Sequence, residues 1–184
     1  MIDNLIIDKV ILDMNNLFLE NNEYFSKTRD VFSARIQSFI TETKRYLEAA
    51  IIGEIGNNTF DHNFGFNSEY PHGVYCNVQY EQKYSVVADY GRGVKQSLLA
   101  VLPSIFSDVE ALEIAFTKRV SGRSPEQRGN GLKFVSSTVQ QNKWNLYFQS
   151  GSASCSIDET GIFFSKQPKK IIGCLAVIDF SGDK

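Results

Sequence analysis

The sequence has no excess of positive charge and no long apolar run. Nineteen Lys and Arg residues stand against 21 Asp and Glu residues, which gives a formal net charge of -2. The chain therefore lacks the basic footprint of a nucleic-acid-binding surface, and we expect any phosphate affinity to come from a local site. No segment reaches the roughly 18 to 20 apolar residues that a membrane-spanning helix needs, so we expect no membrane association.

Cysteine is also scarce. The three cysteines, Cys76, Cys155 and Cys174, are odd in number and widely spaced, and they predict neither a zinc site nor a disulfide framework. Each falls within a strand-like alternation, so we expect small apolar core residues. The segment 1–15 lacks the basic leader and continuous apolar core of a signal peptide. These features favour a reducing cytoplasm.

The composition is that of a globular protein. Of 184 residues, 42% are apolar and 22% are charged, which argues against disorder and fibrous repeats. A chain of this length suits one domain, residues 1–184, with one hydrophobic core. Within it, residues 1–31 are predicted to hold an N-terminal strand at 4–13 and a connecting segment.

Helical and strand periodicities alternate along the rest of the chain. Apolar residues at helical spacing predict one long amphipathic helix from Phe32 to His62. The order of helices and hairpin-connected strands then predicts an α/β fold, a two-layer α/β sandwich. The other predicted elements are strands 73–80 and 83–89, helical stretches 94–103 and 107–119, a helix from 132, and strands 144–150, 153–164 (with a turn at 159–161) and 171–180.

Polar residues occupy the end of the long predicted helix. Five turns separate Ile36 from Glu54, so at 3.6 residues per turn the Glu54 carboxylate points the way the core does. Asn58, Asp61 and His62 extend this face. Buried polar groups without partners cost about 1 to 3 kcal/mol each, so a bound ligand and metal are expected to meet them. The alternative is a helix that emerges into solvent near its end.

An acidic residue follows the predicted strand 83–89 and enters a turn with two glycines. Gly91 and Gly93 permit a tight turn and a close backbone approach beside Asp89. A carboxylate at that strand end can accept a hydrogen bond from an exocyclic amine such as that of adenine. Taken alone, the D-x-G-x-G pattern also suits an ordinary Asp/Gly turn.

A second glycine turn stands directly before a predicted helix, at Arg128, Gly129, Asn130, Gly131 and Leu132. Glycines at this position leave the first backbone N–H groups of the helix free, and these groups with the helix dipole form an anion site. Such a site suits a phosphate. Alone, the G-x-G pattern before a helix more often marks the end of a loop.

The three patterns E-x-x-x-N-x-x-x-H, D-x-G-x-G and G-x-G-L occur in that order, each on a suitable predicted element. In this the chain resembles the GHKL superfamily of gyrase, heat-shock chaperone, histidine kinase and MutL ATPases, over residues 32–180. Lys133 stands where many members have a third glycine. The matching residues are Glu54, Asn58, His62, Asp89, Gly91, Gly93, Gly129, Gly131 and Leu132.

The resemblance implies a Bergerat fold, with a mixed, largely antiparallel sheet covered by helices on one face. It also implies an ATP site under a mobile lid at residues 94–128. Asn58 would supply a Mg²⁺ ligand, Asp89 would contact the adenine amine, and Glu54 would act as general base. The remaining implied contacts are His62, Gly91, Gly93, the phosphate turn Arg128–Leu132, and Lys118, Arg123 or Arg128 as cations on the lid. Asp61 departs from the family pattern, and this added acid either binds metal or caps the helix end.

The chain has no room for a histidine-kinase dimerisation hairpin, and in size it looks most like the stand-alone anti-sigma-factor kinases. We therefore expect a cytoplasmic Mg–ATP-binding regulator that phosphorylates Ser or Thr on a protein partner. The alternatives are a non-catalytic switch that binds a partner through its lid, and a slow ATPase. A homodimer is also possible from the sequence.

Overall fold

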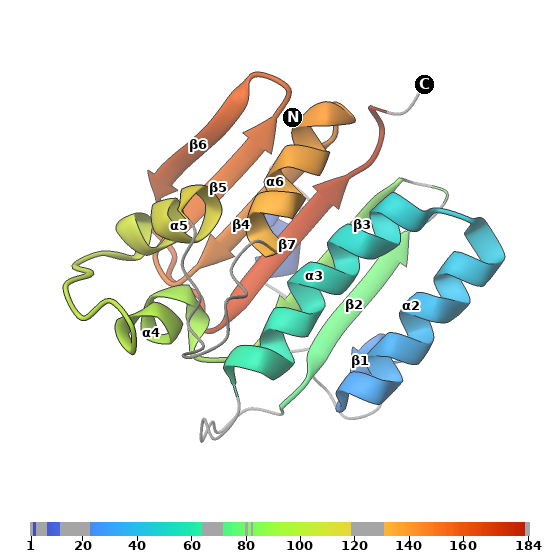
Figure 1. Ribbon diagram of the computed structural model, residues 1–184, viewed down its shortest axis with the longest axis horizontal. Helices are drawn as coiled ribbons and strands as arrows, with labels where there is room; N and C mark the ends of the chain where they lie inside the picture. The colour runs from blue at the N-terminus through green and yellow to red at the C-terminus, as the bar shows by residue number, and fades with distance from the viewer. Residues whose placement is uncertain are drawn as a thin grey trace.

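A single antiparallel sheet runs through the molecule (Figure 1). The computed structural model describes residues 2, 7–11, 23–63, 72–79, 81, 83–118 and 131–182. In this part of the chain the strand order is β1-β2-β3-β7-β4-β5-β6, and every neighbouring pair is antiparallel. The strands are β1 (Phe25–Ser26), β2 (Val74–Gln79), β3 (Tyr84–Asp89), β4 (Asn145–Ser150), β5 (Ala153–Asp158), β6 (Gly161–Lys166) and β7 (Cys174–Asp179).

Helices form a second layer on one face of this sheet (Figure 1). They bury their apolar stripes against alternate strand residues, and Phe32, Leu112 and Trp144 are among the largest side chains of this core. The two-layer α/β sandwich predicted from the sequence is confirmed. The helices are α2 (Arg29–Thr43), α3 (Tyr46–His62), α4 (Gly93–Leu99), α5 (Asp108–Thr117) and α6 (Gly131–Gln141).

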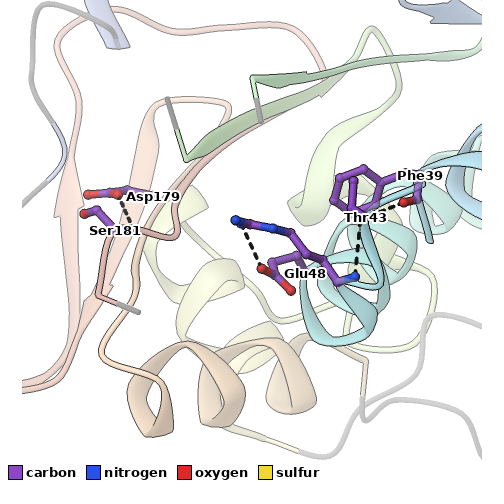
Figure 2. A network of polar contacts seen from close by, with 6 residues as sticks. Phe39, Thr43, Glu48, Asp179 and Ser181 are labelled. Carbon is purple, nitrogen blue, oxygen red and sulfur yellow. Dashed lines mark hydrogen bonds and ion pairs between the residues drawn. The ribbon is translucent and has the colours of Figure 1, made fainter. Parts of the chain in front are cut away.

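The single long helix predicted from Phe32 to His62 is wrong, because the chain turns a corner between α2 and α3. Lys44 adopts a left-handed conformation with φ of 60° and ends α2. Thr43 stabilises the corner, since its hydroxyl donates to the carbonyl of Phe39 at 2.6 Å and accepts from the backbone N–H of Arg45 at 3.2 Å. Figure 2 shows Thr43, Phe39 and Glu48 gathered at this corner.

Because of this corner, the five-turn count from Ile36 to Glu54 does not hold. The direction of the polar residues is set by α3 itself, whose buried face includes Ile51, Ile55 and Thr59 at four-residue spacing. Asn58 lies three residues after Ile55 and therefore borders this buried face. Glu54 is exposed, so the prediction that its carboxylate points the way the core does is wrong.

A very close approach joins α2 to α3. A Cβ atom added at Gly56 would lie 2.3 Å from the ring of Phe32, which is fully buried. Only glycine leaves space for this ring, and the contact holds the two helices together beside the sheet.

The strand predicted at 4–13 is wrong in its described part, because residues 7–11 are helical. Ile7, Val10 and Ile11, at spacings of three and four residues, contribute to an apolar cluster with Tyr75 and Val177. Tyr75 and Val177 belong to the sheet face opposite the helices, so the N-terminal turn covers part of that face. The sequence also gave no signal for β1, which is only two residues long.

The region predicted as a mobile lid, residues 94–128, holds α4 and α5 in its described part. In α5 the apolar residues are buried against β5 and β6. The carboxylate of Asp108 accepts bonds from the backbone N–H and the hydroxyl of Ser152, at 2.8 and 2.7 Å. Residues 119–130 lie outside the described residues, so the lid remains a prediction.

Candidate functional site

A cavity of about 300 Å³ lies between the helices and the sheet. Its volume is at the lower end of the range of roughly 300 to 1,000 Å³ found for small-molecule sites. Within the described part of the chain, residues from α2, α3, β3, α4, α5, α6, β4 and β7 line it. Eight of the predicted site residues are among them: Glu54, Asn58, Asp61, His62, Asp89, Gly93, Gly131 and Leu132.

The innermost of these groups is Asp89, the last residue of β3, with 7% of its surface exposed. The hydroxyl of Thr59 donates to its Oδ2 at 3.2 Å, and the backbone N–H of Gly91 donates to its Oδ1 at 2.6 Å. Burial raises the pKa of Asp89 to about 6, against the lowering effect of these donors. Above that pH, Asp89 is a buried, oriented acceptor for an N–H donor.

Asn63, at the C-terminal end of α3, holds the turn that follows Asp89. Its side-chain oxygen accepts from the backbone N–H of Arg92 at 3.0 Å, and its amide nitrogen lies 3.5 Å from Oδ1 of Asp89. A Cβ atom at Gly91 would lie 1.9 Å from this amide. Only glycine fits at position 91, because the Asn63 side chain lies so close to its backbone. Gly91 contacts Asp89 but does not line the cavity.

Thr59 and Asn63 are site residues that the sequence reasoning missed. Thr59 follows Asn58 directly in α3, and Asn63 is the residue just after the helix, so both are polar where the end of an amphipathic helix meets the sheet. This position was the one available signal, but only the fold brings them to Asp89.

A buried hydroxyl, that of Ser150 in β4, connects the neighbouring elements. It accepts from the backbone N–H of Val94 at 3.0 Å and donates to the carbonyl of Gly173 at 3.1 Å. Gly93 has a φ of 74°, a conformation that favours glycine, and it begins α4 above this hydroxyl. Burial raises the pKa of the Cys174 thiol well above its usual range, and the nearby Asp89 carboxylate adds a smaller effect in the same direction. This thiol, which lines the cavity, is therefore neutral.

The opposite side of the cavity contains Glu54 and Gly131. Glu54 is exposed, and a Cβ atom at Gly131 would lie 2.4 Å from its Oε2, so the first turn of α6 lies directly against this carboxylate. Asn57 also lines the cavity, and its buried side-chain oxygen has no hydrogen-bond partner among the described residues. Unpaired buried acceptors are rare, so this oxygen is a candidate contact for a bound group.

Asp61 forms an ion pair with Arg29 of α2 at the rim. The sequence left open whether Asp61 binds metal or caps the helix, and the structure gives it a cation as partner. Burial lowers the pKa of His62, and the positive charge of Arg92 adds a smaller effect in the same direction. The imidazole is therefore neutral near pH 7.

These residues fit a magnesium-bound nucleotide in their chemistry. Asn58 and the carboxylates offer the oxygen ligands that Mg²⁺ prefers, and α6 begins with Gly131 at the cavity, where a helix N-terminus suits a phosphate. In the described ranges no three His, Cys, Asp or Glu side chains gather closely enough to hold a metal alone. Phosphates and waters would have to complete the coordination. Arg128, Gly129 and Asn130 lie outside the described residues.

No helix in the described segments has both the length and the apolar character needed to cross a membrane.

No protein-family model matches the chain, and no curated protein matches it. Among solved structures, the chain is similar to the 43K ATPase domain of Thermus thermophilus gyrase B in complex with an aminocoumarin. The two are 13% identical with a TM-score of 0.44, and the match covers 78% of this chain. This chain spans 38% of the length of the gyrase chain.

Proposed function

We propose that this chain is a GHKL-type protein that binds Mg–ATP in the cavity beside Asp89. The observation that supports this most is that Glu54, Asn58 and Asp89, taken from two separate sequence motifs, line one cavity with the first turn of α6. A bound Mg–ATP needs polar groups for its metal ion, its adenine base and its phosphates, and all of these groups must surround one cavity.

Each residue has a role in this proposal. Asp89 accepts a hydrogen bond from the adenine amine, held in place by Thr59 and Gly91. Asn58 supplies its amide oxygen to Mg²⁺, and the backbone N–H groups at Gly131 contact phosphate at the N-terminus of α6. Bound Mg–ATP supplies the transferable phosphoryl group.

The chemical use of the nucleotide that we propose is phosphorylation of Ser or Thr on a protein partner, in a cytoplasmic signalling role. Glu54 is exposed at the cavity, where its carboxylate can take the proton of an attacking hydroxyl. The oxygen of that hydroxyl bonds to the γ-phosphorus as the bond to the departing ADP breaks. A switch that only binds ATP and a partner makes no use of this proton transfer.

Two measurements test the proposal. In a thermal-shift titration, ADP and ATP with Mg²⁺ should raise the melting temperature of the wild type, and Asp89→Asn should abolish the shift. Labelled ATP should then transfer phosphate to a partner with wild type but not with Glu54→Ala. If Glu54→Ala keeps both nucleotide affinity and biological activity, the non-catalytic switch is correct. Phosphate release without an acceptor would identify an ATPase.

A further inference from the structure

Arg29 is the one permanently positive side chain among the described residues that line the cavity. It comes from the first turn of α2, outside all three sequence motifs. The other ionisable side chains of this lining, apart from the high-pKa thiol, are Glu54, Asp61, Asp89 and the neutral His62. The described wall is therefore acidic, although the proposed nucleotide carries several negative charges.

The guanidinium of Arg29 is positioned by two neighbours on α3. Oδ1 of Asp61 pairs with Nη2 of Arg29, and the guanidinium carbon lies 5.9 Å from the ring centroid of Phe60. The side chain of Arg29 is 45% exposed and that of Asp61 is 17% exposed. Ion pairs as exposed as this contribute about 1 kcal/mol or less to stability, so the pair can be broken by a stronger anion.

A di- or triphosphate is such an anion. It carries more charge than one carboxylate, and the planar guanidinium fork can bind two phosphate oxygens at once. Because Arg29 and Gly131 line the same cavity, phosphates bound at α6 would lie in the cavity that Arg29 also lines.

We propose that Arg29 is a phosphate-binding residue of the nucleotide site, held by Asp61 until a di- or triphosphate replaces that carboxylate. Arg29 then makes the site selective for phosphorylated ligands over the bare nucleoside. This inference rests on the proposed ATP binding and extends it to a residue that the motifs do not contain.

Calorimetric titration of adenosine, ADP and ATP tests the inference. Arg29→Met should lower ADP and ATP affinity about tenfold or more, the loss of one charge-assisted hydrogen bond, and leave adenosine affinity within about twofold. Arg35→Met, on the same helix but away from the cavity, is the matched control and should change none of the three. Asp61→Asn should raise ADP affinity in Mg²⁺-free buffer, and this gain should disappear in the Arg29→Met background.

If Arg29 has only a structural role, the titrations should give different results. The inference is overturned if Arg29→Met weakens adenosine and ATP by the same factor, or if Asp61→Asn acts equally with and without Arg29. If wild type binds all three ligands and Arg29→Met matches it, only this inference fails. If wild type binds none of them, the proposed ATP binding fails, and the role of Arg29 fails with it.

Discussion

The hydroxyl of Thr59 in α3 donates a hydrogen bond to the buried carboxylate of Asp89 in β3, at 3.2 Å. The bond crosses from the helix layer to the sheet layer. It orients the one carboxylate that is almost fully enclosed in the candidate site.

Removing this donor should destabilise the protein in a pH-dependent way. Thr59→Val keeps the shape but leaves Asp89 with fewer donors, at a cost of about 1 to 3 kcal/mol where Asp89 is ionised. The cost should shrink near pH 4, where Asp89 is protonated. Urea unfolding at pH 4 and 7 measures it. Thr41→Val, an exposed threonine of α2, is the control, and an equal cost at both pH values would contradict the assigned bond.

Ionisation of Asp89 should lower the free energy of unfolding as the pH rises. Its pKa in the folded protein is about 6, above the ordinary 3.8, so the folded state binds the proton more tightly than the unfolded state. Its contribution is therefore most favourable below about pH 4 and is lost as the pH rises to about 6. Two pKa units correspond to about 3 kcal/mol.

Asp89→Asn lacks this titration. Its unfolding free energy relative to wild type should therefore increase by about 2 to 3 kcal/mol from pH 4 to pH 7, even though we expect the variant to lose the proposed nucleotide binding. Chemical denaturation across this pH range measures the difference. Parallel pH profiles for the two proteins would show that Asp89 is not buried as described.

The contact of Gly56 with Phe32 predicts opposite effects for two glycines of one helix. Gly56→Ala should destabilise by about 1 to 3 kcal/mol, because its Cβ would overlap the buried ring of Phe32. Gly53→Ala, with nothing within 4 Å of the added atom, should stabilise by about 0.5 to 1 kcal/mol through helix propensity. Thermal and urea unfolding of both variants check this. Equal changes in the free energy of unfolding for the two variants would contradict the close packing of α2 against α3 at Gly56.

Two thiols should be inert in the folded protein. Burial raises the pKa of both Cys76 and Cys155 to about 12, so neither forms a thiolate at pH 8. Mass spectrometry after treatment with a maleimide should find both unmodified in native protein and modified in urea. Fast native labelling at either position would contradict the core assignment.

The sequence was sufficient to predict most helices and strands, and to predict the side of the site that contains Glu54 and Asn58. Alternation predicted β2 and β4, and the capping residues Ser107 and Glu110 predicted the start of α5, where Ser107 accepts from the N–H of Glu110 at 3.1 Å. These features depend on interactions between residues close in the chain. The spacing of Glu54 and Asn58 on one helix face is likewise a local property.

Tertiary structure decided the rest. The break at Lys44 was hidden because apolar residues continue on both sides of it at helical spacing, and the segment 7–11 contains both helical and strand patterns. The bond from Thr59 to Asp89 and the pairing of Arg29 with Asp61 join residues about 30 positions apart. Periodicity and motifs describe neighbours along the chain, whereas burial and such contacts depend on how layers pack, which is set only when distant segments meet.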